Sequence, residues 1–211
     1  MPAPIVTSQP QRSAIRSAWL ISLVSVLWTA IAGATGIAIG LADGSGILVV
    51  FSAVGIVDAV GSAALVYHFG HALRHAKISE GLERTAHGIV TIGLIVVGLA
   101  AMGANAFRLV TGLGSHSSGV AAGLAAASLA VLIILSLRKR AVARIVMSGA
   151  LLTDAHLSAV GALLAAMALI GIVVTQAFGW WWVDAAAAMA IGCIALVLGI
   201  VSRPRNSDDT P

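Results

Sequence analysis

Six apolar runs, each long enough to cross a bilayer, constrain the fold of this chain more than any other feature. A transmembrane helix needs about 20 consecutive apolar residues, and the runs cover residues 18–41, 47–67, 88–110, 119–137, 146–175 and 180–201. Only 9% of the residues are charged, whereas a soluble domain has about 25%. The sequence therefore predicts an all-α polytopic protein of the cell membrane. Its six transmembrane helices fill residues 18–202, between polar tails at 1–17 and 203–211.

The distribution of Lys and Arg predicts the orientation of these helices. With six spans, eleven of the twelve basic residues fall on the side that carries both termini, and only Arg108 falls on the other side. Basic residues mark cytoplasmic loops, so we expect both termini in the cytoplasm. Arg108 is expected to extend its side chain to the opposite interface. The basic pI of about 10.2 follows from this bias, and we expect the bilayer rather than nucleic acid as the partner.

Three ionisable residues fall inside the predicted spans, where an ionisable group is a functional candidate because its burial is costly. Asp58 lies in the second span, and Asp154 and His156 lie in the fifth. Two carboxylates and an imidazole suit a divalent transition metal ion or a proton. Alternatively, the carboxyls are protonated or hydrogen-bonded to hydroxyl groups one turn away, such as those of Ser62 and Ser158. Asp154 and His156 are about 200° apart around a helix, so only one can face the site, and Asp154 is the first choice.

A second candidate metal site is a stripe of histidines after the second span. His68, His71 and His75 are spaced i, i+3 and i+7, so they share one face if the helix continues past the membrane. Two or three imidazoles on one face can hold a metal ion. The alternative is that they are interfacial histidines without a ligand, since Arg74 and Lys77 would repel a cation. The single Cys193 excludes an intramolecular disulfide and a cluster of thiolate ligands.

Glycines at helical spacing predict close helix contacts. Gly33, Gly36 and Gly40 share the first span, and Gly119 and Gly123 open the fourth. Small residues at such spacing let helices approach closely in lipid. We interpret both sets as packing faces.

Three segments carry a resemblance to a known family. They are residues 44–49 leading to Asp58, residues 153–156 (Thr-Asp-Ala-His), and residues 178–187, which begin Phe-Gly-Trp-Trp-Trp-Val-Asp. Together they resemble the membrane domain of the cation diffusion facilitator family. The resemblance implies six helices with both ends inside, a homodimer, and exchange of a divalent cation (zinc, manganese or iron) for protons. It implies a transporter rather than an enzyme, with no resident cofactor.

The metal site that the resemblance implies is reduced in this chain. The family places ligands four residues apart on the second and fifth helices. Here the partner position of Asp58 is Val54, and the two positions on the fifth helix are Leu157 and Gly161 or, with the match shifted by one, His156 and Val160. Either way, at least two of the four ligands are missing. Two hypotheses follow. The chain is a small cation transporter that uses Asp58 with Asp154 or His156, or it is a non-transporting membrane scaffold that keeps the fold without the metal site.

Overall fold

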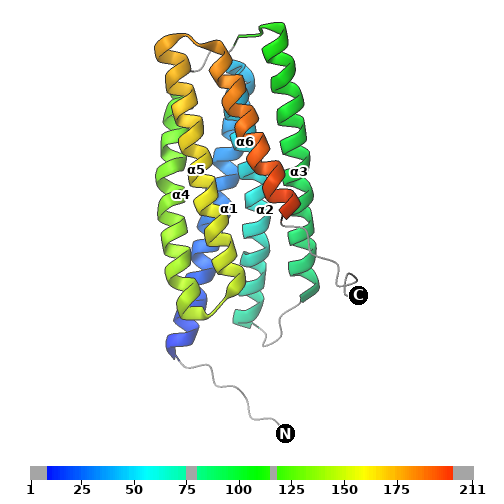
Figure 1. The fold of residues 1–211 in the computed structure, drawn as a ribbon. Coiled ribbons are helices and arrows are strands. Elements are labelled where there is room, and N and C mark those ends of the chain that lie inside the picture. Colours follow the sequence, from blue (N-terminus) through cyan, green and yellow to red (C-terminus); the bar gives the residue numbers. More distant parts are fainter. Residues whose placement is uncertain (1–8, 75–79, 115–117, 202–211) are drawn as a thin grey trace, which may run out of the picture.

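Six long helices make up the structure, a computed structural model that describes residues 9–74, 80–114 and 118–201. All six are long and apolar enough to span a membrane, which confirms the predicted all-α polytopic fold (Figure 1). The helices are α1 (Gln9–Asp43), α2 (Gly46–Arg74), α3 (Glu80–Thr111), α4 (Gly119–Val146), α5 (Gly149–Phe178) and α6 (Trp181–Val201).

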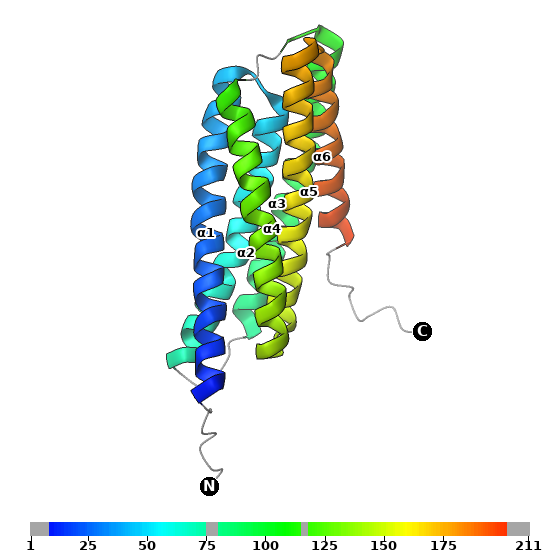
Figure 2. The same ribbon diagram turned by 90° about the vertical axis from the view of Figure 1, so that its left-hand side faces the viewer.

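The helices run up and down as a bundle built from three closely packed pairs. α1 packs mainly on α2, α4 on α5, and α3 on α6. α2 also contacts α3, α5 and α6, so it lies between the α3–α6 pair and the rest of the bundle (Figures 1 and 2). With an even number of helices, α1 begins and α6 ends toward the same end of the bundle. We call this the terminal end, and the other the opposite end.

Glycines allow the closest helix approaches, as predicted for the first span. A Cβ at Gly33 would lie 2.8 Å from the side chain of Ile56, and one at Gly40 would lie 2.9 Å from the backbone nitrogen of Val49. The same holds for α3 and α6, where a Cβ at Gly98 would lie 2.7 Å from the carbonyl oxygen of Gly192. Gly119 and Gly123 differ from the prediction, because a Cβ at either would meet nothing within 4 Å among the described residues. Neither glycine lies at a close helix approach in that part of the chain.

The end of α4 differs from the sequence prediction in a way that matters for the site. Residues 138–144, predicted as a loop, belong to α4, which continues to Val146. This segment holds no Gly or Pro, and Arg, Lys and Ala are good helix formers, so nothing local stops the helix. It ends at Met147, which adopts a left-handed conformation with φ of 55°, and Ser148 caps α5. The first helix also begins earlier than predicted, at Gln9 rather than residue 18.

Candidate ion-pair site inside the bundle

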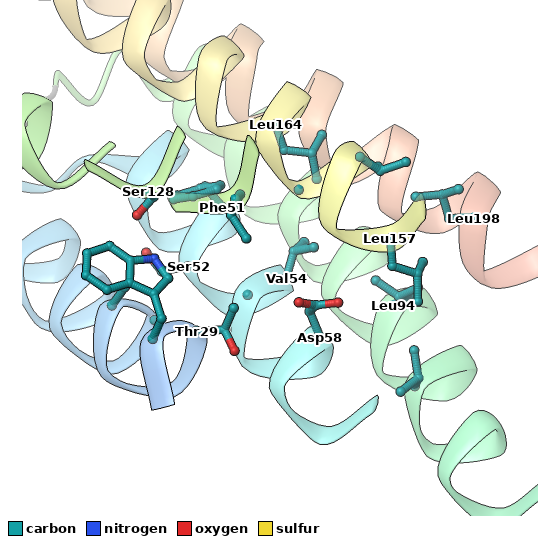
Figure 3. A pocket seen from close by; sticks show the side chains of 18 residues that line it. Thr29, Phe51, Ser52, Val54, Asp58, Leu94, Ser128, Leu157, Leu164 and Leu198 are labelled. Atoms are coloured by element: carbon teal, nitrogen blue, oxygen red, sulfur yellow. The ribbon is translucent and has the colours of Figure 1, made fainter. Parts of the chain in front are cut away.

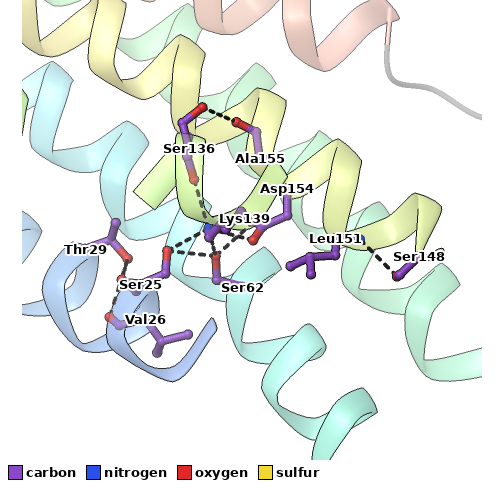
Figure 4. A network of polar contacts seen from close by, with 11 residues as sticks. Ser25, Val26, Thr29, Ser62, Ser136, Lys139, Ser148, Leu151, Asp154 and Ala155 are labelled. Atoms are coloured by element: carbon purple, nitrogen blue, oxygen red, sulfur yellow. Dashed lines mark hydrogen bonds and ion pairs between the residues drawn. The ribbon is translucent and has the colours of Figure 1, made fainter. Parts of the chain in front are cut away.

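Lys139 lies inside the bundle, although sequence analysis placed it in a loop. Its side chain is fully buried, and it is the largest fully buried side chain among the described residues. A buried ammonium is several kcal/mol unfavourable unless it is paired and hydrogen-bonded. The surroundings of Lys139 provide both (Figure 4).

The Lys139 ammonium has a close acceptor for each of its three N–H groups. Its Nζ lies 2.6 Å from Oδ2 of Asp154 and 2.8 Å from the hydroxyls of Ser25 and Ser158. The Ser62 hydroxyl is 3.4 Å away and donates to Oδ1 of Asp154 at 3.0 Å. Four helices, α1, α2, α4 and α5, therefore meet at one ion pair. An ammonium has three donors and no acceptor, so this group is fully satisfied.

The phase of α4 explains why Lys139 points inward while its neighbours do not. The buried face of this helix repeats at intervals of three and four residues, from Ala121 through Ser128, Leu132 and Leu135 to Ala143. Position 139 falls on this face. Arg138 and Arg144 fall on the exposed side. The buried face of α5 contains both Asp154 and Ser158, one turn apart.

Asp58 lies beside the ion pair, one turn of α2 before Ser62. Its carboxyl lies close enough to interact electrostatically with Asp154 and Lys139. It is partly buried and lines a cavity of about 60 Å³ between the helices. Figure 3 shows the carboxylate among apolar side chains such as Val54 and Leu157. Asp58, Asp154 and Lys139 thus form one charged cluster, formally with one net negative charge.

The structure brings two of the predicted site residues together and separates the others. Asp58 and Asp154 share the cluster, whereas His156 is exposed on the outside of α5. This agrees with the expectation that only one of Asp154 and His156 can face the site. Within the part of the chain that the structure describes, no group of three or more His, Cys, Asp or Glu side chains could hold a metal ion.

The histidine stripe lies only partly within the described residues. His68 is partly buried on α2, with its ring edge-on to Phe69 at a centroid distance of 5.2 Å. His71 lies on the same helix, which extends past the membrane span as far as Arg74. His75 lies outside the described residues, so a metal site on this stripe stays a prediction.

A second charged cluster closes the opposite end of the bundle. The carboxylate of Asp184, which is fully buried, accepts hydrogen bonds of 2.7 Å from the Ser45 hydroxyl and the Gly46 N–H. Arg108 lies 3.3 Å from the same carboxylate and also donates to the carbonyl of Gly44. Asp184 therefore joins the start of α6 to the start of α2 and the end of α3. Arg108, predicted to extend its side chain to the opposite interface, lies at that end of the bundle with its guanidinium turned to this buried carboxylate.

Sequence analysis missed Lys139 and Asp184, the two residues that complete these clusters. Lys139 was counted with the loop charges because three further basic residues surround it. Asp184 was read only as part of a turn segment similar to the family's sixth helix. The signal that identifies Lys139 as inward-facing is the helical spacing of small and apolar residues from Ala121 to Leu135. One further turn of this spacing reaches position 139.

The charged cluster can exchange protons or bind a cation, since it combines two carboxylates with one ammonium inside an apolar bundle. Intramembrane carboxylates and their cationic partners mark ion and proton pathways.

Comparison with models of known protein families finds no match to this chain, and comparison with curated proteins finds no relative.

Proposed function

We propose that this chain is a cation transporter that works in exchange for protons, with Asp58 and Asp154 as the exchanging groups and Lys139 as their internal counter-charge. The observation that carries the proposal is the Lys139–Asp154 ion pair, with the Asp58 carboxyl within electrostatic reach of it, in a bundle whose other buried residues are almost all apolar or hydroxyl-bearing. Alternating access would expose the cluster first to one side of the membrane and then to the other.

Charge favours a singly charged substrate at this cluster. Two carboxylates and one ammonium leave one net negative charge, which one proton or one monovalent cation neutralises. A zinc, manganese or iron ion, which the family resemblance implies, would have to share Asp154 with the Lys139 ammonium, 2.6 Å from its Oδ2. Such an ion would enter only if Lys139 released its proton or moved away, since an uncompensated buried charge is strongly unfavourable.

The second candidate function is a membrane scaffold that transports nothing. It is favoured by the completeness of the hydrogen bonding around Lys139, whose three donors all have close acceptors. An ammonium with close acceptors for all its donors, paired at 2.6 Å with a carboxylate, needs no further ion. In that case the cluster only joins four helices, and partner or lipid binding would be the function.

We further propose that the terminal end faces the cytoplasm and that the chain works as a homodimer in the cell membrane. The orientation is supported by the charge bias, which persists when Lys139 is left out, because ten basic residues then remain on that side. Such a bias is typical of cytoplasmic loops. The homodimer is supported by the family resemblance alone.

The test is proton flux in proteoliposomes that contain the purified protein and an internal pH-sensitive dye. Sodium, potassium, zinc, manganese and iron(II) are added outside one at a time. The proposal expects at least one of them to drive proton movement. Asp58→Asn, which keeps the shape and removes the charge, should lower the rate roughly a hundredfold, as loss of an essential proton-transfer group does.

His156→Gln is the matched control, since His156 is a titratable group on the same helix as Asp154 but is exposed. Its flux should equal that of the wild-type protein. Wild-type protein that is silent toward all five cations would support the scaffold instead. Equal loss in both variants would refute the assignment of the site to Asp58.

A further inference from the structure

The Lys139 ammonium sits among four oxygen atoms, which we call the oxygen cage (Figure 4). The distances from Nζ are 2.6 Å to Oδ2 of Asp154 and 2.8, 2.8 and 3.4 Å to the hydroxyls of Ser25, Ser158 and Ser62. The oxygens come from three helices, α1, α2 and α5, and the three serines are fully buried. Oxygen ligands of this kind suit hard cations, so the cage is built to hold a cation, and the lysine supplies one.

The spacing of the oxygen cage selects the size of the cation. Zinc and magnesium keep their oxygen ligands at about 2.0–2.2 Å, and calcium keeps them at about 2.3–2.6 Å. The cage oxygens lie 2.6–3.4 Å from its centre at Nζ, so the cage would have to contract around any of these ions. An ammonium group is close to a potassium ion in size. The space that Nζ fills therefore suits potassium or free ammonium, and the single carboxylate of the cage balances one positive charge.

The charge of the surroundings calls for one more cation than the chain provides. Lys139 is the only buried basic residue among those described, whereas two carboxylates, of Asp154 and Asp58, lie within its electrostatic reach. One ammonium cannot balance both, and an uncompensated buried charge is strongly unfavourable. Lysine has a long and flexible side chain, so its ammonium can leave the cage and pair with Asp58. A monovalent cation in the cage would then balance Asp154, and each carboxylate would have one cation.

We propose that the oxygen cage is a binding site for a monovalent cation of the size of potassium or ammonium, and that Lys139 is its tethered competitor. The cation enters when the lysine side chain swings out, and it is expelled when the side chain returns. The binding site stands on the four oxygens and on the net charge. That the cage is where the transported ion binds rests on the proposed transport function.

Equilibrium binding of radioactive rubidium, which stands in for potassium, tests the site in the purified full chain. Wild-type protein in detergent should bind rubidium at a single site per chain. Lys139→Ala should bind it roughly tenfold more tightly or better, because the wild-type cage is free in only a small fraction of molecules. Unlabelled potassium and ammonium should displace the rubidium. Choline, which is too large for the cage, and magnesium, which is too small, should not.

Serine variants locate the bound ion. Ser25→Ala and Ser158→Ala each remove one oxygen of the cage, and each should weaken rubidium binding roughly tenfold, as loss of one polar contact to a charged group does. Ser22→Ala is the matched control, and its binding should equal that of the wild-type protein. Ser22 is as buried as Ser25 and lies on the same helix, but its hydroxyl has no hydrogen-bond partner among the described residues. These mild variants keep the test decisive if Lys139→Ala fails to fold.

The outcomes separate the binding site from the function. Wild-type protein that binds no rubidium would overturn the proposal, because Lys139 would then be a permanent part of the cage. Equal binding by Ser25→Ala, Ser158→Ala and Ser22→Ala would also overturn it, since the ion would lie elsewhere. Displacement of rubidium by magnesium at lower concentrations than by potassium would refute the assignment to a monovalent cation. Rubidium binding without proton flux in proteoliposomes would defeat the transport function and leave the site standing.

Discussion

Replacing Lys139 by methionine tests whether the buried ion pair holds the bundle together. Methionine keeps the length and packing of the side chain but removes the charge that faces Asp154. The carboxylate, only 4% exposed, would keep one hydrogen bond, from Ser62, and lose its cation. Removing one partner of a buried pair is unfavourable by about 3–5 kcal/mol. For a chain of this size, each kcal/mol lowers the Tm by about 2–4 °C, which gives a decrease of roughly 6–20 °C.

The double variant Lys139→Met, Asp154→Leu distinguishes a broken ion pair from damaged packing. Exchange of both partners for apolar residues of similar volume is often neutral or stabilising, so the double variant should regain most of the lost stability. Arg138→Met, one residue away but exposed, is the control and should leave the Tm within about 2 °C, as surface substitutions do. Thermal unfolding in one detergent suffices for all four proteins. A double variant less stable than Lys139→Met would refute the reasoning, because the pair would then contribute only through packing.

Three further outcomes are expected. Gly98→Ala should destabilise the protein by about 1–3 kcal/mol, because its Cβ would lie 2.7 Å from a carbonyl oxygen of α6, whereas Gly103→Ala on the same helix has open space. Equal thermal stability of the two variants would contradict this packing. Asp184→Asn should lower the free energy of unfolding by about 3–5 kcal/mol, since it leaves Arg108 without its buried counter-charge. An unchanged Tm in thermal unfolding would show that the second cluster is not stabilising. The orientation is tested in a background without the native cysteine, with an impermeant maleimide added outside intact cells. Leu113→Cys should react and Met147→Cys should not. The reverse pattern would contradict the proposed orientation.

The fold could be predicted from the sequence because its dominant signal is length. Six apolar runs of spanning length leave few alternatives, and the turns at Gly44 and Gly179 carry glycines in left-handed conformations, with φ of 63° and 67°. The boundary of α4 could not be predicted from charge alone. A cluster of Arg and Lys indicates a membrane edge, yet these residues are also good helix formers.

The candidate site could be predicted only in part. Asp58 and Asp154 were found because a carboxylate inside an apolar run is conspicuous. Lys139 was not, because it is one of four basic residues within seven positions, and only the helical phase separates it from the exposed Arg138 and Arg144. Contact between residues 25, 62, 139 and 154 depends on tertiary packing, which no local pattern encodes. The same holds for Asp184 and Arg108, which are 76 positions apart.

Proton release by the purified protein tests the central claim most directly, since it needs no membrane orientation and no flux. The protein is placed in weakly buffered detergent, a cation is added, and the pH change is recorded for each of the five ions named above. If a cation displaces a proton from the carboxylates, about one proton per chain should be released on binding, as ligands must lose their protons to bind a cation. Asp58→Asn should release none, and His156→Gln should release as much as the wild-type protein. Equal release by Asp58→Asn and wild type, or no release with any of the five ions, would contradict the account.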